Sequence, residues 1–327
     1  MKANQSFLII QTAFLGDVIL ATALVEKVKE MYPDAEIDFL LRKGNEAILE
    51  KHPHIRELII FDKRKKYKNL LQLIFKIRKS KYDYVLNLQR FATSGLLTIF
   101  SGGGQTIGFD KNPLSFLFSK KVTHLMNGMH EAFRNQLLIP DQLKGNFLLP
   151  KLYPNESDYQ KIESFKKQAF ITISPASVWQ TKQWPKHKWI ELIKKIPAGL
   201  KIFLLGGPGD FDLCKEISLS FSKESVEILA GRLSLLQSAA LMKFAQMNFV
   251  NDSAPMHLAS GMNAPVTAIF CSTVPEFGFG PLSDDSKIIE VKNLNCRPCG
   301  LHGHRSCPKG HFKCAEDIEI SSLLPVS

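Results

Sequence analysis

Residues 7–17 read FLIIQTAFLGD, which is an apolar strand, a short polar turn and the start of an amphipathic helix. Residues 248–257, NFVNDSAPMH, repeat this order near the other end of the chain. Ligands of α/β proteins bind at such points, because the carboxyl end of a strand meets the N-terminus of a helix there. Two of these turns in one chain predict two facing halves with a substrate between them.

The strand–turn–helix alternation continues through both halves of the chain. It predicts an α/β protein with parallel, doubly wound sheets. We expect strands at 7–11, 36–41, 57–61, 84–88, 105–108, 170–174, 201–205, 226–229, 248–251 and 266–271. We expect helices at 17–31, 46–52, 67–79, 90–100, 185–196, 210–221, 234–244 and 254–261. The polar, proline-bounded segment 140–154 is the predicted linker, which gives domains of residues 1–152 and 153–327.

Length and composition agree with two domains of ordinary size. A chain of 327 residues corresponds to roughly two domains of about 150 residues each, and the hydrophobic fraction of 45% is enough for two cores. The net charge of +11 favours an anionic partner, which leaves a nucleotide, a nucleic acid or an acidic membrane surface open. No apolar run reaches the roughly 18 residues of a membrane span. The first ten residues lack the pattern of a signal peptide, so we expect a cytoplasmic protein.

The turn at Gly16-Asp17 has two interpretations. Gly16 allows a tight backbone turn, and Asp17 at a helix N-terminus is stabilised by the helix dipole as an ordinary cap. Alternatively, Asp17 is a carboxylate at the carboxyl edge of a sheet, able to accept a proton from a substrate hydroxyl. The turn has no G-x-G-x-x-G pattern, so a dinucleotide fingerprint is not supported.

Lys182 lies in the loop between a predicted strand and the helix that starts near Pro185. A lysine at this place is a natural partner for a phosphate, although a solvated surface lysine is equally common in a basic protein. The three tryptophans of the chain, at 179, 184 and 189, surround it, and we expect one or two of them to pack in the core.

Two other turns of the second half carry weaker signals. Gly206-Gly207 would let a ligand approach the backbone closely, but an ordinary strand-to-helix turn has the same composition. Residues 251–253 form a dense set of helix-capping side chains, and one would suffice for capping, so the excess indicates recognition of an anion or a sugar. His257 falls on the first turn of that helix, either as a structural residue or as part of the site.

A segment rich in cysteine, histidine and glycine, residues 295–315, replaces the strand–helix pattern near the C-terminus. Its four cysteines are Cys296, Cys299, Cys307 and Cys314. They could hold a structural zinc, but their spacing does not match the common pairs of C-x2-C. Free or easily oxidised thiols are the alternative. We expect this segment to be separable from catalysis.

Residues 63–81, KRKKYKNLLQLIFKIRKSK, contain no acidic residue. The simple interpretation is a helix that buries its apolar face on the sheet and is flanked by solvated lysines. The alternative is a patch that lies against anionic lipid headgroups.

Taken together, these segments resemble the bacterial lipopolysaccharide heptosyltransferases, glycosyltransferase family 9, over nearly the whole chain. The matching segments are 10–23 around Gly16-Asp17, 82–89 (YDYVLNLQ), Gly108-Phe109, His130-Glu131 with Arg134-Asn135, 182–185 and 250–259 (VNDSAPMHLA). No single match is specific, but their order and spacing together are.

The resemblance implies a GT-B architecture, with two Rossmann-like domains that face a cleft. It implies that the N-terminal domain binds the acceptor, for which we select Gly16, Arg90 and Arg134, and that Asp17 is the catalytic base. It assigns ADP-heptose to the C-terminal domain. The candidate donor-binding residues are Ser177, Lys182, Gly206, Gly207, Asp252, Ser253, Ala254 and His257. The chain departs from the family at Ala254-Pro255, where Gly-Leu is common, and Pro255 removes one amide from the helix start.

The expected activity is an inverting transfer of heptose to a lipid-anchored, anionic saccharide. No cofactor is required for this chemistry, and the enzyme would work as a peripheral protein at the cytoplasmic face of the inner membrane. Two alternatives remain open. A nucleotide-sugar epimerase of the same architecture would act on the donor alone, and a zinc-bearing nucleic-acid-binding protein would use the net charge and the cysteines. Two large α/β halves without an aromatic-basic stripe argue against nucleic acid.

Overall fold

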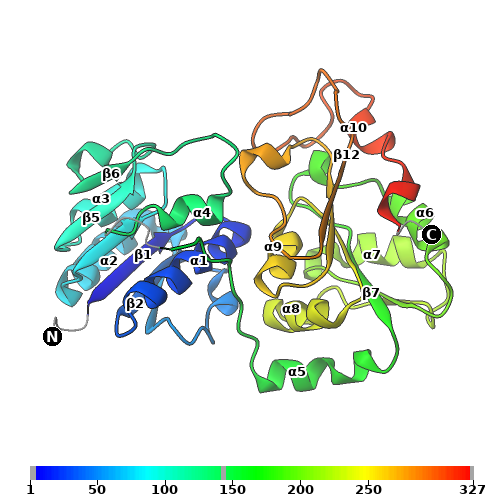
Figure 1. Cartoon of the computed structure of the whole chain (residues 1–327), viewed down its shortest axis with the longest axis horizontal. Helices are drawn as coiled ribbons and strands as arrows, with labels where there is room; N and C mark the ends of the chain where they lie inside the picture. The colour runs from blue at the N-terminus through cyan, green and yellow to red at the C-terminus, as the bar shows by residue number, and fades with distance from the viewer. Residues whose placement is uncertain (1–4, 141–144, 325–327) are drawn as a thin grey trace. The chain divides into compact units, whose positions relative to one another are not determined.

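The computed structural model describes residues 5–140 and 145–324 (Figure 1). The chain forms two compact units, Met1–Tyr153 and Pro154–Ser327. Each unit has its own six-stranded sheet, and all the strand pairs in both sheets are parallel. The predicted α/β class with doubly wound parallel sheets is therefore confirmed.

The sheet of the first unit has the strand order β3-β2-β1-β4-β5-β6. Its strands are β1 (Ser6–Gln11), β2 (Glu36–Arg42), β3 (Glu57–Phe61), β4 (Tyr84–Asn87), β5 (Gln105–Phe109) and β6 (Lys120–Val122). β1 is central, and Ile10 lies opposite Leu40 on one side and Asn87 on the other. Residues 7–10 of β1 are completely buried, because helices cover both faces of a parallel sheet. This double coverage explains why the strand reads as an unbroken apolar run.

The helices of the first unit connect these strands. They are α1 (Leu15–Met31), α2 (Lys66–Ser80), α3 (Ala92–Ile99) and α4 (Glu131–Gln136), with 3-10 turns at η1 (Glu46–Ile48), η2 (Lys63–Lys65) and η3 (Ser115–Leu117). α4 packs beside α1 (Figure 1). This contact brings Glu131, the first residue of α4, toward the N-terminal turn of α1.

The second unit repeats the topology of the first, with the order β12-β11-β10-β7-β8-β9. Its strands are β7 (Phe170–Ser174), β8 (Lys201–Leu204), β9 (Val226–Ile228), β10 (Asn248–Asn251), β11 (Val266–Phe270) and β12 (Ser286–Glu290). Its helices are α5 (Glu156–Ile162), α6 (Lys186–Lys195), α7 (Phe211–Ser218), α8 (Leu235–Phe244), α9 (Ala254–Gly261) and α10 (Lys313–Glu316). Its 3-10 turns are η4 (Glu163–Lys166), η5 (Gln180–Lys182), η6 (Pro208–Asp210), η7 (Pro275–Phe277) and η8 (Ile320–Leu323).

The end of the chain completes the core of the second unit. Cys314, Ala315 and Ile318 are buried against Trp184 and Trp189, which are themselves completely buried. The two indole rings meet edge to face with centroids 4.9 Å apart, and Trp184 Nε1 donates to the carbonyl oxygen of Ala315 at 3.0 Å. The prediction that one or two tryptophans pack in the core is confirmed.

The structure differs from the predicted elements at a few places. The helix expected at 46–52 is wrong, since only the 3-10 turn η1 forms there. Pro53 disfavours helical backbone at His52 and stops a longer helix. Five helices and strands were not predicted: β6, β12, α4, α5 and α10. Of the predicted linker, residues 141–144 lie outside the described residues, and 145–154 contain no helix or strand.

Candidate active site

The carboxyl ends of β1 and β4 meet at the centre of the first sheet. The strand order reverses direction between them, and ligands of doubly wound sheets bind at such a switch point. Gln11 ends β1, Gln89 follows β4, and Asp17 lies in the first turn of α1. The fold therefore places the predicted base at the edge of the sheet where a substrate would bind.

Asp17 is partly buried, and one of its oxygens, Oδ2, accepts a hydrogen bond from the backbone N–H of Phe14 at 3.2 Å. This contact closes the first turn of α1, so Asp17 does act as a helix cap, and the question is whether it has a second role. Desolvation, helped by the negative charge of Glu131, raises the pKa of Asp17 to about 6. The Phe14 amide and the Lys111 ammonium act in the opposite direction but do not outweigh the first two. A carboxylate tuned close to neutral pH suits a general base better than a plain cap.

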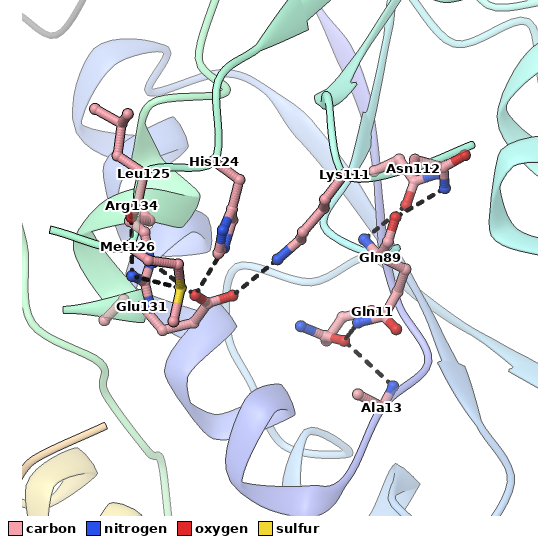
Figure 2. Close-up of polar contacts among 12 residues, drawn as sticks. Gln11, Ala13, Gln89, Lys111, Asn112, His124, Leu125, Met126, Glu131 and Arg134 are labelled. Atoms are coloured by element: carbon pink, nitrogen blue, oxygen red, sulfur yellow. Dashed lines mark hydrogen bonds and ion pairs between the residues drawn. The ribbon is translucent and has the colours of Figure 1, made fainter. Parts of the chain in front are cut away.

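Glu131 is the centre of a cluster of charged side chains (Figure 2), and its negative charge acts on Asp17. Its Oε2 atom lies 2.9 Å from Arg134 Nε and 3.3 Å from His124 Nε2, and Lys111 Nζ lies 3.8 Å from Oε1. Burial alone would raise the pKa of Glu131, but His124, Lys111 and Arg134 lower it to about 2. Burial also lowers the pKa of Lys111. The cluster thus keeps a permanent carboxylate next to Asp17.

Amide side chains hold the turn that precedes Asp17. Gln89 Nε2 donates to Gln11 Oε1, which also accepts the backbone N–H of Ala13 at 3.2 Å (Figure 2). Asn112 Nδ2 donates to the carbonyl oxygen of Gln89 at 2.8 Å, and Asn45 Nδ2 donates to that of Ala13 at 3.0 Å. Because these bonds are buried or half-buried, they fix the backbone of the loop that presents Asp17.

The three predicted acceptor-binding residues occupy different environments. Gly16 lies in the first turn of α1, and Arg90 is exposed after β4, with its guanidinium 5.3 Å from the centre of the Phe91 ring. Arg134 is buried, and besides Glu131 its guanidinium donates to the carbonyl oxygen of Leu125 at 3.1 Å. These contacts are those of a residue that orients Glu131. That Arg134 contacts the acceptor stays a prediction.

The second sheet has an equivalent switch point between β7 and β10. Lys182, in the loop after β7, places Nζ 2.6 Å from Oδ2 of Asp252, which follows β10. Thr273 Oγ1, in the loop after β11, donates to the same carboxylate oxygen at 2.5 Å. Asn251 joins the loops as well, since Nδ2 donates to the carbonyl oxygen of Pro175 at 2.8 Å and Oδ1 accepts the Trp184 N–H at 2.9 Å.

The other predicted donor residues lie at the same edge of the second sheet. Ser253, Ala254 and His257 form the cap and first turn of α9, where His257 is buried. The Ser177 N–H donates to Gln183 Oε1 at 3.2 Å, in the loop that also contains Lys182. Gly206 and Gly207 follow β8, the strand next to β7, and the Gly207 N–H donates to Asp210 Oδ2 at 2.8 Å, as in an ordinary capped turn.

The four cysteines of the C-terminal segment are free thiols. Cys296 Sγ lies 3.9 Å from His311 Nε2. Within the described ranges, no group of three or more histidine, cysteine, aspartate or glutamate side chains is arranged to hold a metal ion. The side chains as they lie in this structure therefore do not form a metal site.

Two Rossmann-like units with this strand order have the architecture of the GT-B glycosyltransferases. The chain belongs to glycosyltransferase family 9 (heptosyltransferase), whose sequence model matches residues 70–309. It is 29% identical to lipopolysaccharide heptosyltransferase 3 of Escherichia coli over 281 residues, which are 80% of this chain and 82% of the relative. The structure of E. coli ADP-heptose lps heptosyltransferase II covers 96% of this chain and is itself covered to 98%, with a TM-score of 0.78 and 22% identity. The structure of E. coli heptosyltransferase WaaC with ADP has a TM-score of 0.73, 20% identity and coverages of 87% and 92%.

Several residues of the two sites were not predicted from the sequence. Glu131 and Gln89 fall in segments that carry the family resemblance, so their position was a usable signal. Lys111, His124 and Thr273 stand in segments without a recognisable pattern. Their roles come from contacts with residues of other elements, such as that of Thr273 with Asp252.

Proposed function

We propose that this glycosyltransferase moves a heptose from ADP-heptose to a lipopolysaccharide core acceptor, with inversion at the anomeric carbon. The observation that carries the proposal is the pair of charged residues that the two switch points present. One presents a carboxylate, Asp17, with a pKa near neutrality, and the other presents an ordered lysine, Lys182. The family and the printed names of the relatives support heptose as the sugar.

Asp17 acts as the general base in this proposal. It takes the proton of the acceptor hydroxyl while that oxygen attacks the anomeric carbon, and the bond from this carbon to the ADP oxygen breaks. The pKa of about 6 leaves Asp17 ionised at neutral pH yet basic enough to accept a proton. Gly16, Arg90 and Arg134 belong to the acceptor side, so residues 1–152 form the acceptor-binding domain.

Lys182 stabilises the negative charge that develops on the leaving ADP. Asp252 holds its ammonium at 2.6 Å and so restricts the flexible side chain. The N-terminus of α9 adds backbone amides at Ser253 and Ala254, but Pro255 in its first turn has none to offer. Ser177, Gly206, Gly207 and His257 complete the proposed donor site of residues 153–327.

A lipid-anchored acceptor requires contact with a membrane surface, and α2 is the element that we propose for it. Leu71 and Phe75 on this helix are 58% and 71% exposed, although Leu70, Leu73 and Ile77 are buried. Exposed apolar residues on a basic helix suit a shallow, reversible contact with anionic headgroups. None of the described helices is long and apolar enough to cross a bilayer. We propose the cytoplasmic face of the inner membrane as the site of action.

A structural zinc held by Cys296, Cys299, Cys307 and Cys314 is a separate proposal. The support comes from the sequence, which places four cysteines within 19 positions, a number that suits a tetrahedral zinc. The thiols would have to turn toward one point and lose their protons, since burial raises the pKa of Cys299 and of Cys314 in this structure. No step of the sugar transfer depends on this metal. Elemental analysis of protein purified without chelator tests the proposal, with about one zinc per chain expected and none contradicting it.

The decisive experiment for the function is a donor screen. ADP- and UDP-sugars are each incubated with a core-oligosaccharide acceptor, and the products are identified by mass spectrometry. Addition of one heptose to the acceptor, with ADP-heptose only, is the expected result. Conversion of a donor without any acceptor would instead indicate an epimerase, and transfer of a different sugar would overturn the assignment of heptose.

A further inference from the structure

The segment Arg297–His304, which we call the bridge segment, lies between β12 and α10 (Figure 1) and contacts two loops of the second unit. One loop follows β7 and carries Lys182. The other follows β11 and carries Thr273, the partner of Asp252. Lys182 and Asp252 both lie outside the bridge segment, yet the bridge segment connects the loops that hold them in place.

Its contact with the loop after β7 includes one backbone–backbone hydrogen bond, two hydrogen bonds of the Thr181 hydroxyl and one ring contact. The Thr181 N–H donates to the carbonyl oxygen of His304 at 3.1 Å, and the His304 N–H donates to Thr181 Oγ1 at 2.7 Å. The Thr181 hydroxyl also donates to the carbonyl oxygen of His304 at 3.2 Å. The His302 ring stacks on Trp179 with centroids 6.2 Å apart. Because Thr181 is the residue before Lys182, these bonds fix the backbone from which the lysine extends.

Its contact with the loop after β11 uses Arg297 and Cys299. Arg297 donates from Nη2 to the carbonyl oxygen of Thr273 at 2.5 Å, while its charge is balanced by Glu290 Oε2 at 2.6 Å. The Cys299 N–H donates to the carbonyl oxygen of Ser272 at 2.8 Å. These bonds fix the loop whose threonine hydroxyl holds Asp252.

The two loops and the bridge segment are packed closely around Gly303. Gly303 has a φ of +76°, and a Cβ atom there would lie 2.7 Å from Thr181 Oγ1, 2.8 Å from Ser272 Oγ and 3.3 Å from Lys182 Cγ. Real Cβ atoms do not come as close to other atoms as the first two distances, and the third is tighter than most of their contacts. The backbone at Gly303 therefore lies against side chains of both loops, and a larger residue there would displace the Thr181 and Ser272 hydroxyls and press on the stem of Lys182.

We propose that the bridge segment is a positioning element of the donor site. It closes a ring of contacts from Lys182 through Asp252, Thr273 and Arg297 to His304 and back to Thr181. The ring orders the ammonium of Lys182 before the donor arrives, so less conformational freedom is lost on binding. The proposal rests on the proposed role of Lys182 at the donor diphosphate. It runs against the expectation that the Cys-rich segment is separable from catalysis.

Gly303→Ala is the first test, and Gly310→Ala is its matched control. Gly310 lies in the same Cys-rich segment with a φ of +74°, but a Cβ atom there meets nothing within 4 Å. Both variants suffer the backbone strain of a positive φ, and only Gly303→Ala displaces the loops. We expect Gly303→Ala to weaken ADP binding about tenfold in calorimetry, while Gly310→Ala stays within about twofold of the wild type. KM for the donor should rise, and KM for the acceptor should stay unchanged.

Thr181→Val and Thr181→Ser provide a second test that does not depend on Gly303. Valine keeps the shape of the side chain but removes the acceptor of the His304 N–H, whereas serine retains the hydroxyl. Weaker ADP binding in Thr181→Val with recovery in Thr181→Ser supports the proposal, even where Gly303→Ala fails to fold.

Two sets of results would overturn the inference in distinguishable ways. If Lys182→Ala weakens ADP binding but Gly303→Ala and Thr181→Val bind it as the wild type does, the bridge segment has no positioning role and the proposed function stands. If the wild type does not bind ADP, or Lys182→Ala binds it with unchanged affinity, the proposed donor site itself is wrong and the inference falls with it.

Discussion

The ammonium of Lys182 and the carboxylate of Asp252 lie 2.6 Å apart, although 70 positions separate them in the chain. Their strands, β7 and β10, are neighbours at the switch point of the second sheet. The pair is largely shielded from solvent, which strengthens the attraction and limits the motion of the lysine. A diphosphate at this edge of the sheet would meet a cation that is already oriented.

Lys182→Ala is expected to weaken ADP binding by about tenfold or more, because a charged partner of the phosphates is lost. The buried Asp252 then lacks its cation and repels the diphosphate in addition. Calorimetry with ADP measures the effect. Lys186→Ala is the control, since Lys186 is exposed and pairs with Glu216 on the surface. Equal, wild-type affinities in the two variants would show that Lys182 does not contact the phosphates of ADP.

Asp17→Asn should leave ADP binding intact and lower turnover about 100-fold or more, which is the scale of a lost general base. Asparagine keeps an oxygen for the Phe14 N–H, so the helix cap survives. The raised pKa means that folding disfavours the charged form of Asp17, so its contribution to stability falls as pH rises from about 4 to about 6. The variant should therefore be at least as stable as the wild type at neutral pH.

Asp158→Asn is the control for Asp17→Asn. Asp158 Oδ2 accepts the N–H of Asn155 at 3.0 Å, which is the same cap geometry in a helix away from the switch points. Loss of activity in both variants would point to the caps, and near-normal turnover of Asp17→Asn would remove Asp17 as the base.

The pH profile of kcat/KM should fall on the acidic side near pH 6, as Asp17 becomes protonated. Lys111 lowers the pKa of Asp17 through its positive charge. Lys111→Gln should therefore raise this pKa and move the acidic limb to higher pH. Lys121→Gln, which changes an exposed lysine of β6, should leave the limb in place. A shift toward lower pH in Lys111→Gln would contradict the proposed electrostatics.

Glu131→Gln should lower the free energy of unfolding by about 3 to 5 kcal/mol, since it removes the carboxylate of a buried ion pair with Arg134. The lowered pKa of Glu131 gives a matching pH dependence in the wild type. The contribution of Glu131 to the free energy of unfolding is complete above pH 4.5, the ordinary pKa of a glutamate, and is lost as pH falls toward about 2. Urea unfolding at pH 7 and at pH 3 measures both effects, and a variant with unchanged stability at pH 7 would refute the account of the cluster.

The α2 region should bind anionic vesicles at low salt and release them at high salt. Changing Lys65, Lys66 and Lys68 to Glu should abolish the binding; the side chains of 65–68 lie outside the described residues, so this prediction depends on their charge alone. The control changes Lys186, Lys194 and Lys195 to Glu, which alters the net charge equally on the exposed side of α6. Vesicle sedimentation distinguishes a local contact from a general effect of charge.

The parts of the fold that sequence predicts best are those that burial dictates. Residues 7–10 of β1 are apolar because both faces of the sheet are covered, and α9 begins directly after Ser253, a residue type that favours helix starts. The edge strands β6 and β12 were missed because water reaches them. Lys120 and Lys121 of β6 are exposed, and so are the first three residues of β12. The edge strand β3 was predicted, because its sequence ELIIF keeps the apolar run that β6 and the start of β12 lack.

The candidate site was predictable only where one segment carries its own signal. Asp17 and Asp252 each lie in a turn between a strand and a helix, so the local pattern identifies them. The environment of Asp17 depends instead on Lys111 and Glu131, which approach it only in the folded chain. No local pattern encodes such a charge cluster, because its geometry arises from packing of α4 on α1.

Because Trp184 packs and hydrogen-bonds to Ala315, the core of the second unit cannot be completed until Ala315 has been synthesised. A ribosome releases both loops of the Lys182–Asp252 pair well before it reaches the codon for Ala315. Until then the nascent second unit has an incomplete core, and the side chains of Trp184 and Trp189 are accessible to chaperones. The first unit has all of its strands by then and is free to fold early. Stalled or prematurely terminated translation would thus yield a chain with a finished first half and an incomplete second half, the half that carries the proposed donor site.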